Sequence, residues 1–565
     1  MSTASANAPV MTAAGGQVYH PRPARNMLII LAGMALMVTY VETMVLPSFE
    51  NFVTFFNYPP TSTVVWILSA YLLVGVIATP VFGKLGDIYG KKKMLMVAMS
   101  IYAVAVSIAG FTPNIGAAFG VSTSNQIYLL IAARGFQGIG MGMFPLAFAM
   151  IPEFFPANRV GQAQGIVSAM FAGGACIGLV LGGLITTTYG WQFTYHTIIP
   201  VAIGLVILAF YILRESPTRT GESVDVAGIS ALGIGLAMLM LGLTESTYWG
   251  WTNFSATMVG PLPWGVPEFI IVAAILFLFF GFWEGRVKFP VIRLRALKER
   301  NILVSNINGV LSGLTMFVMF TTLTIVAELP APPGFNQNPF YMGLLSLPAA
   351  ASMLALGMPL GRMTARYGPK PVMVLGFALS TFGALLLTQY ANPAFQLGTF
   401  HSGSPNGFAV PVLLLIAPAF VLVGTVAVLI SMSNVIVLSV GPRELGVQTG
   451  MNQTFRNLGS AIGPVLVSAI ISLFIIGYIP LPPPIGNEPI YSVAAFQYCF
   501  VALAVFGLIG VGLSAFLKNY RFQSDGTRHE VSLVGKHTST VFVPGAADPP
   551  MKTPSEATPA RPPAD

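Results

Sequence analysis

Three charged residues, Glu42, Arg134 and Arg456, lie within or at the edge of long apolar runs, and Glu42 alone of the 19 acidic residues sits well inside one. An uncompensated charge inside a membrane costs at least ~2.5–3.5 kcal/mol, so such residues usually face a cavity and a partner. Burial favours a neutral carboxyl and a nearby arginine favours a charged one, which suits a group that binds and releases a proton. We therefore predict proton coupling at Glu42 and Arg134.

The positions of these two residues along their apolar runs support the pairing. Glu42 lies near the outer end of the first run and Arg134 near the outer end of the fourth. Because a helix rises 1.5 Å per residue, both side chains lie at similar depth. Gln137 follows Arg134 by one turn on the same face, so we expect it to line a cavity, and Asn306 is a weaker candidate for the same role. A static ion pair, or a Glu42 that stays protonated and packed, is the structural alternative.

A second group of residues occupies the short loop between the second and third runs: Gly83, Asp87, Gly90 and Lys91. Glycines let a helix end and a loop pack closely, and Asp87 can contact helix ends or basic residues that separate when the inner mouth opens. We predict that these four residues form a gate, and we interpret the following Lys92 and Lys93 as topology signals.

Three glycines of the fifth run, Gly174, Gly178 and Gly182, recur every four residues and so share one face of a helix. Small residues let neighbouring membrane helices approach closely. Simple packing is an adequate explanation of this face. The alternative is a close-packed seam that keeps the centre sealed while two halves of the molecule move.

These residues are positioned by fourteen apolar runs, each near the 20 residues that a helix needs to cross a bilayer. The predicted spans are 27–47, 63–83, 94–111, 127–150, 163–187, 195–213, 226–244, 266–285, 304–328, 341–362, 371–389, 409–432, 453–476 and 493–517. Residues 1–26 lack a compact signal-peptide core with a cleavage site, so we expect the first span to be retained.

Composition and charge placement agree with this count. Of 565 residues, 55% are hydrophobic and 8% charged, against about 25% charged in soluble domains. Of the 27 Lys and Arg, all except the two intramembrane arginines fall in the tails or in loops that fourteen crossings place on one side of the membrane. The loops on the opposite side contain none. Both termini are then predicted to be cytoplasmic, in a cell-membrane protein. The net charge of +8 is thus a topology signal, and we expect no nucleic-acid partner.

Two segments recur in the second half of the chain at nearly the same offset. The segment from Gly83 is weakly similar to that from Gly361, and the segment from Gly174 to that from Gly459. Duplicated six-helix halves favour a transporter that works by alternating access. The predicted divisions are 1–26 (cytoplasmic tail), 27–213 (first half), 214–303 (two-helix insertion and linker), 304–517 (second half) and 518–565 (disordered cytoplasmic tail).

The loop after the second span resembles the signature of the major facilitator superfamily, with Gly83, Leu85, Asp87, Gly90 and Lys91 at its positions. The segment from Arg134 is similar to the fourth-helix motif of that superfamily. The fifth helix resembles its antiporter motif, with Gly174, Gly178, Gly182 and Gly183, although Leu179 stands where that motif has Pro. The resemblance, with fourteen helices, implies an all-α fold of two six-helix halves plus two inserted central helices, as in fourteen-helix drug:proton antiporters.

We therefore expect a monomeric secondary transporter, and most directly the proton-coupled efflux of small lipophilic or amphipathic compounds. The residues expected to face the cavity are mostly Phe, Met and Gly, which favours efflux over the alternative, proton-coupled uptake of a polar metabolite. A membrane enzyme or a scaffold for lipid handling is a third reading, without the clustered intramembrane His, Asp or Ser that would mark an enzyme. No Walker loop, metal-ligand spacing or nucleophile motif is present, so the proton gradient is the expected energy source.

Overall fold

The structure, a computed structural model, describes most of residues 20–530. Residues 1–19 and 531–565, which make up most of the two predicted tails, lie outside the described residues. Short internal segments also lie outside them: 58–61, 217–218, 220–222, 250–256, 260–261, 293, 330–333, 393–397, 401–407, 441–444, 481–486, 519 and 523–527.

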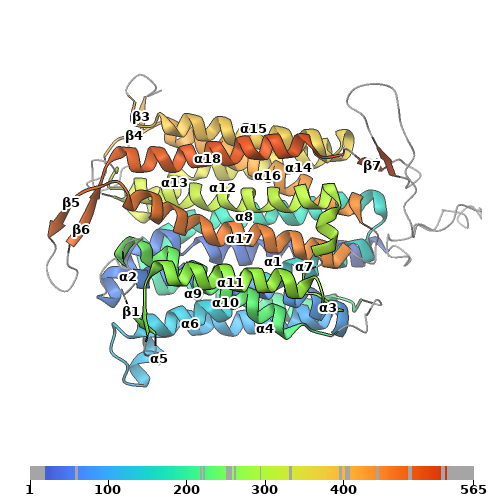
Figure 1. Cartoon of the computed structure of the whole chain (residues 1–565), viewed down its shortest axis with the longest axis horizontal. Coiled ribbons are helices and arrows are strands. Elements are labelled where there is room, and N and C mark those ends of the chain that lie inside the picture. Colours follow the sequence, from blue (N-terminus) through green and yellow to red (C-terminus); the bar gives the residue numbers. More distant parts are fainter. Residues whose placement is uncertain are drawn as a thin grey trace, which may run out of the picture.

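Fourteen helices of the described chain are long and apolar enough to cross a membrane, as predicted. They lie side by side along one direction and form a single bundle (Figure 1). The first six crossings are α1 (Pro21–Thr43), α3 (Ser62–Tyr89), α4 (Lys91–Gly110), α6 with α7 (Gln126–Gly138 and Met143–Phe154), α8 (Ala157–Tyr189) and α9 (Trp191–Ile212). The next two are α10 (Val226–Trp249) and α11 (Val266–Glu284). The last six are α12 (Arg300–Glu328), α13 with α14 (Pro339–Leu345 and Leu347–Tyr367), α15 (Pro369–Thr388), α16 (Leu413–Ser439), α17 (Leu445–Ser472) and α18 (Val493–Ala515).

The fourth crossing changes its helical form near the middle. A 3₁₀ turn, η2 (Ile139–Gly142), separates α6 from α7 in a glycine-rich stretch. Gly140 packs against the ring of Tyr102 and Gly142 against that of Phe82, so side chains at either position would collide with α4 or α3. The glycines therefore let this crossing run close to both neighbouring helices.

Short elements cap the two ends of the bundle. Hairpins β1–β2 (Thr257–Val259, Leu262–Trp264), β3–β4 (Thr399–Phe400, Val410–Pro411) and β5–β6 (Ile475–Pro480, Asn487–Tyr491) lie at one end, with α2 (Phe49–Phe56) and α5 (Thr112–Ala118) (Figure 1). The remaining short helical turns are η1 (Leu46–Ser48) and η3 (Leu294–Lys298). Hairpin β7–β8 (Tyr520–Phe522, Arg528–Glu530) lies at the other end, within the segment predicted to be a tail. We call this second end, which also holds the α3–α4 turn, the basic end.

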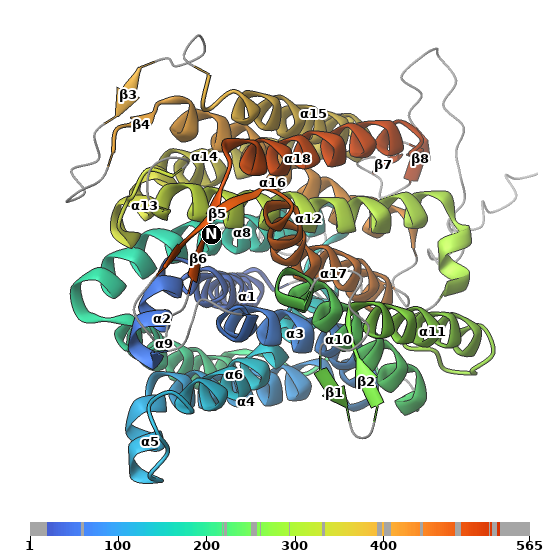
Figure 2. The same cartoon turned by 60° about the vertical axis from the view of Figure 1, so that its left-hand side comes forward.

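The two inserted helices pack against the rest of the bundle through α10, which contacts both α3 and α17 (Figure 2). Polar contacts at the basic end join α10 to α11 and join the insertion to α3. Trp283 Nε1 of α11 donates to Asp225 Oδ1, just before α10, at 3.0 Å. Lys84 Nζ of α3 donates to the carbonyls of Phe289 and Pro290, in the segment that follows α11. The loop motif of α3 thus binds the linker that leads from the insertion to α12.

Candidate functional site

Glu42 lies near the end of α1 and is 1% exposed. Its Oε2 atom has no hydrogen-bond partner. The cations whose charges act on the carboxyl are Arg456 of α17 and Arg134 of α6. A buried charge is stable only when it is both paired and hydrogen-bonded. Glu42 meets these conditions only in part, because one carboxyl oxygen is buried without a hydrogen bond. Its role in proton coupling stays a prediction.

Arg134 is fully buried and is held mainly by groups other than Glu42. Its guanidinium donates to the Gln137 side chain at 2.7 Å and to the carbonyls of Val41 and Ile67 at 3.4 and 3.1 Å. Its Nη2 atom has no partner, so no hydrogen bond joins it to the Glu42 carboxylate. The contact with Val41 places Arg134 at the depth of Glu42, as predicted, whereas a static ion pair is absent from these described side chains.

Arg456 belongs to the second half of the chain but faces the first. Its guanidinium carbon lies 4.2 Å from the ring centroid of Phe171 on α8, and Nη2 donates to Asn457 Oδ1 at 2.8 Å. Asn457 Nδ2 in turn donates to Thr79 Oγ1 of α3 at 2.9 Å. A guanidinium that stacks on an aromatic face and forms directed hydrogen bonds is held in one orientation. Arg456 therefore presents a fixed positive charge toward Glu42 from across the interface between the halves.

A small cavity of about 20 Å³ lies beside Arg456, between α7 and α8 on one side and α16 and α17 on the other. Its wall residues are Phe144, Phe148, Ser168, Phe171, Leu429, Met432, Ser433, Gln453 and Arg456. A cavity of this size holds about one water molecule. Five of the nine lining residues are aromatic or aliphatic and four are polar or charged. The Phe-, Met- and Gly-rich substrate cavity expected from the sequence stays a prediction.

Gln137 and Asn306 both lie in the bundle interior, each 0% exposed. Gln137 accepts the hydrogen bond from Arg134, and its Nε2 atom has no partner. Asn306 Nδ2 donates to the Ile302 carbonyl at 2.8 Å, and its Oδ1 accepts from Asn452 of α17 at 3.3 Å. Gln137 thus adjoins the central arginine, whereas Asn306 bonds to its own helix and to a neighbouring helix. Their role in binding substrate stays a prediction.

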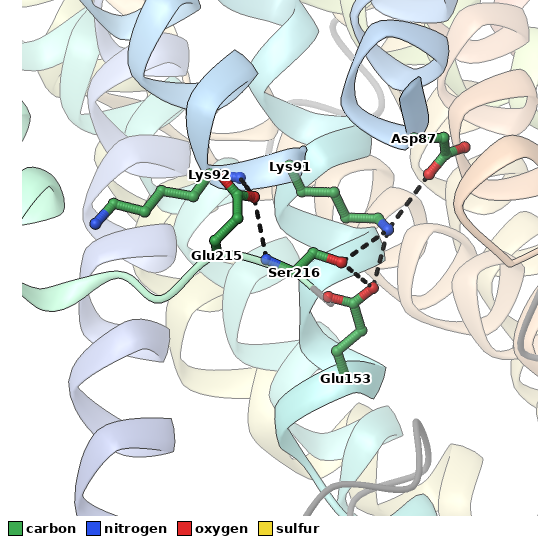
Figure 3. Close-up of polar contacts among 6 residues, drawn as sticks. All are labelled: Asp87, Lys91, Lys92, Glu153, Glu215 and Ser216. Atoms are coloured by element: carbon green, nitrogen blue, oxygen red, sulfur yellow. Dashed lines mark hydrogen bonds and ion pairs between the residues drawn. The ribbon is translucent and has the colours of Figure 1, made fainter. Parts of the chain in front are cut away.

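Two of the four predicted gate residues, Asp87 and Lys91, belong to a polar network at the basic end (Figure 3). Lys91 Nζ lies 3.3 Å from Asp87 Oδ1 and 2.9 Å from Glu153 Oε1. Ser216 Oγ donates to the same Glu153 oxygen at 2.8 Å and accepts from Lys91 at 3.4 Å. The network therefore ties together the ends of α3, α4 and α7 and the segment after α9. Lys91 is its centre because it bridges two carboxylates.

Gly90 links α3 to α4 with φ +106°, a conformation that a residue with a side chain rarely adopts. A Cβ atom at this position would lie 2.7 Å from Glu215 Oε1. The Glu215 carboxylate uses this space to accept from the backbone N–H groups of Lys92 and Lys93, at 3.0 and 3.1 Å. It therefore caps the N-terminus of α4, where a negative charge is stabilising.

Pro145 of α7 lies between Gly83 of its own half and Gly450 of the other half, on the side of the central charges toward the basic end. A Cβ on Gly83 of α3 would lie 3.6 Å from Pro145 Cβ of α7, and a Cβ on Gly450 of α17 would lie 3.3 Å from the same atom. At the opposite end of the interface, Gly343 of α13 approaches the Val180 backbone of α8, where an added Cβ would lie 2.8 Å from Cα. The halves thus touch on both sides of the central charges.

The glycine face of α8 packs directly on the backbone of α1. Added Cβ atoms on Gly174 and Gly178 would collide with carbonyl oxygens of α1, and one on Gly182 would lie 2.7 Å from Met44 Cα. The Gly183 carbonyl accepts from Thr187 within α8. The same pattern recurs between α17 and α12, where Gly459 lies against the carbonyl of Val310. This equivalence accords with the repeat seen in the sequence.

Sequence reasoning left three of these residues out of the predicted site. Arg456 was visible as an intramembrane arginine, but its proximity to Glu42 depends on how the halves pack. Glu153 and Glu215 lie near the ends of predicted spans, where an acidic residue is unremarkable. Their positions directly after the fourth and sixth spans, at the same end as the loop motif, were the available signal.

Family and structure comparisons agree with this architecture. The family model described as Major Facilitator Superfamily matches residues 31–326 and 306–545. The chain belongs to the major facilitator superfamily. As a member, it is a multi-pass membrane transporter, which confirms the fold class expected from the loop motif.

Relatives within the superfamily include several transporters of bacteria. An MFS-type transporter of Mycobacterium tuberculosis is 27% identical over 525 residues, covering 90% of this chain and 72% of that protein. The multidrug transporter protein MdtP of Bacillus subtilis is 25% identical over 418 residues (73% and 69%). The tetracenomycin C resistance and export protein of Streptomyces glaucescens is also 25% identical over 418 residues (72% and 68%).

Solved structures share the fold at lower identity. The human organic anion transporter MFSD10 aligns with TM-score 0.54 and 14% identity, over 87% of this chain and 99% of that one. The proton:xylose symporter XylE aligns with TM-score 0.57 and 12% identity, over 87% and 95%. At such identity the likeness concerns the fold alone.

Proposed function

We propose that this transporter exports small lipophilic or amphipathic compounds in exchange for protons, by alternating access between two six-helix halves (27–213 and 304–517). The observation that carries the proposal is Glu42, a buried carboxyl with one unpartnered oxygen, acted on by Arg134 from its own half and by Arg456 from the other. When the halves rock, the distance between Glu42 and Arg456 changes. Protonation of Glu42 is thereby coupled to the conformation of the transporter.

The direction of transport is inferred from the cavity lining and from the relatives. Phe, Leu and Met make up five of the nine residues that line the cavity beside Arg456, and this part of the lining would suit an apolar substrate once the cavity opens. Two of the relatives named above are a multidrug transporter and an antibiotic export protein. The alternative is proton-coupled uptake of a polar metabolite, which the polar part of the same lining (Ser168, Ser433, Gln453 and Arg456) would suit.

The proposal includes orientation in the membrane. We propose that the basic end faces the cytoplasm, because the loops and tails at that end contain the Lys and Arg of the chain outside the membrane. Both termini are then cytoplasmic, and the transporter works in the cell membrane as a monomer. The network around Lys91 becomes an inner gate that is assembled when the cytoplasmic mouth is closed and broken when it opens.

The proposed coupling role is tested with Glu42→Gln in proteoliposomes that contain a lipophilic fluorescent dye. We expect this variant to lose accumulation driven by a pH gradient while it retains dye exchange at zero gradient, because exchange needs binding and rocking but no net proton transfer. Glu268→Gln, at the first turn of α11, is the matched control and keeps both activities. Full gradient-driven accumulation in Glu42→Gln would overturn the assignment.

A further inference from the structure

An open groove with a volume of about 840 Å³ runs along the outside of the bundle at the basic end, between α4 and α9. The residues that line it are Lys92, Lys93, Met96, Val97, Ser100, Ile101, Phe210, Leu213, Arg214 and Glu215. The groove lies on the lipid-facing side of these helices, away from the central charges, and its residues take no part in the proposed transport cycle.

The rim of the groove is positively charged. Lys92, Lys93 and Arg214 stand at the end of the groove where α4 begins and α9 ends. Lys92 Nζ is held over the groove by its hydrogen bond to the Phe210 carbonyl at 2.8 Å, which uses one of its three protons. The one acid in the lining, Glu215, has both oxygens bonded to backbone N–H groups of α4. Glu215 is therefore held against the backbone of α4, and the rim is a cationic surface because three basic side chains outnumber this one acid.

Below the rim, the groove becomes apolar in the direction of the bilayer interior. Its wall there consists of Met96, Val97, Ile101, Phe210 and Leu213. Exposed apolar side chains continue along the same two helices toward the middle of the membrane: Val104 at 60%, Ile207 at 51% and Ile203 at 46%. A ligand that fits both parts needs an anionic group at the rim and a hydrocarbon chain below it.

We propose that this groove binds an acidic phospholipid, with its phosphate group at Lys92, Lys93 and Arg214 and an acyl chain between α4 and α9. Basic pockets between membrane helices at the cytoplasmic surface recognise acidic headgroups in this way. A soluble phosphate lacks the hydrocarbon chain that the apolar wall would bury. A zwitterionic lipid has that chain but lacks the net negative charge.

The groove adjoins the Lys91 network, so a lipid bound in the groove would affect the proposed inner gate. Glu215 and Ser216 are adjacent in the chain; Glu215 lies in the groove, and Ser216 bonds to Glu153 in the Lys91 network. The N-terminus of α4 is the positive end of the helix dipole, so the lysines beside it are electrostatically unfavourable. A bound anionic headgroup also neutralises the charge of these lysines. The lipid therefore stabilises the arrangement in which the ends of α4, α7 and α9 are held together.

The test measures lipid binding to the purified transporter by native mass spectrometry, with phosphatidylglycerol and phosphatidylcholine as probes. We expect preferential retention of phosphatidylglycerol, and about tenfold weaker phosphatidylglycerol binding in Lys93→Gln/Arg214→Gln, with phosphatidylcholine binding unchanged. Arg366→Gln/Lys370→Gln, basic residues at the same end but outside the groove, is the matched control and retains the preference.

Two results would overturn the site. One is phosphatidylglycerol binding that is equal in the groove variant and the control variant. The other is competition by inorganic phosphate at the same concentration as lipid, which would show an anion site without the acyl chain. A third variant, Val97→Trp, fills the apolar wall without removing a charge, and weaker lipid binding in this variant supports the groove. Unchanged size-exclusion profiles show that each variant is folded.

Discussion

Glu42 is the one acid among the central residues, and its environment is built from both halves of the transporter. Arg134 is fixed by Gln137 and by backbone carbonyls of α1 and α3, all in the first half. Arg456 is fixed by Asn457 and stacks on Phe171 across the interface. In the proposed cycle, one cation therefore stays with Glu42 during rocking and the other moves relative to it. We propose on this ground that conformation acts on Glu42 through Arg456.

Two variants of Arg456 distinguish the effect of its positive charge from the effect of its planar guanidinium group. We expect Arg456→Lys to keep proton coupling at a reduced rate, because the charge remains but the stacked, directed guanidinium is lost. Arg456→Gln removes the charge and lowers gradient-driven transport about tenfold or more. The measurement is initial dye flux in proteoliposomes, with Arg366→Gln on the exposed surface of α14 as the control. Equal flux in the Lys and Gln variants would contradict a role for the charge.

Gly90 leaves space for Glu215 to cap the N-terminus of α4. We therefore predict that replacing Gly90 lowers the stability of the protein. Gly90→Ala places a side chain at φ +106° and a Cβ atom 2.7 Å from Glu215. We expect the free energy of unfolding to fall by about 1–2 kcal/mol, measured by thermal unfolding in detergent. Gly204→Ala on α9, where an added Cβ meets nothing within 4 Å, is the control. Equal stability of the two variants would show that the close approach of Glu215 is not required.

Helix pairs α1–α8 and α12–α17 are the equivalent close-packed seams of the two halves. Thr43 Oγ1 of α1 donates to the Ala175 carbonyl of α8 at 2.6 Å, which adds a hydrogen bond to the backbone contact at the glycines. Contact of this kind transmits motion along the length of a helix because packed backbones do not yield separately. In the proposed cycle, α1 and α8 therefore move together, and Glu42 moves with them.

A change at Gly178 tests this rigid seam. Gly178→Ala would place a methyl group against the Tyr40 carbonyl and Thr43 of α1, so the helices must separate. We expect transport per folded molecule to fall on the order of tenfold, measured as dye flux normalised to protein in the vesicles. Gly165→Ala on the same helix meets nothing within 4 Å and serves as the control. If Gly178→Ala lowers the stability of the protein but leaves the dye flux normal, this glycine face serves only helix packing and has no role in transport.

Helix positions were predictable because each span is long, continuous and bounded by charge, and hydrophobic length alone decides which segments can cross a bilayer. The common depth of Glu42 and Arg134 followed from helix rise and alternating direction. The partners of Lys91 did not follow, because Glu153 and Ser216 meet it only after three helices pack. For the same reason, Arg456 could be noted as unusual but could not be placed beside Glu42.

The whole molecule, in its described residues, holds the central charges between two contacts of the halves. Pro145 with Gly450 closes the basic end, and Gly343 with Val180 closes the opposite side. The cavity between these contacts has space for about one water molecule. In the proposed alternating-access cycle, either mouth would open by separation of one of these contacts. The insertion packs against both halves through α10, and Lys84 of the first half donates to its linker.

The direction of proton movement tests the central claim most directly. Proteoliposomes that contain a pH-sensitive dye receive a gradient of lipophilic substrate at equal internal and external pH, with valinomycin and potassium present to clamp the membrane potential. The proposed exchange predicts that protons move opposite to the substrate in the wild-type transporter and do not move in Glu42→Gln. Proton movement in the same direction as the substrate, or substrate flux without any proton flux, would contradict the account.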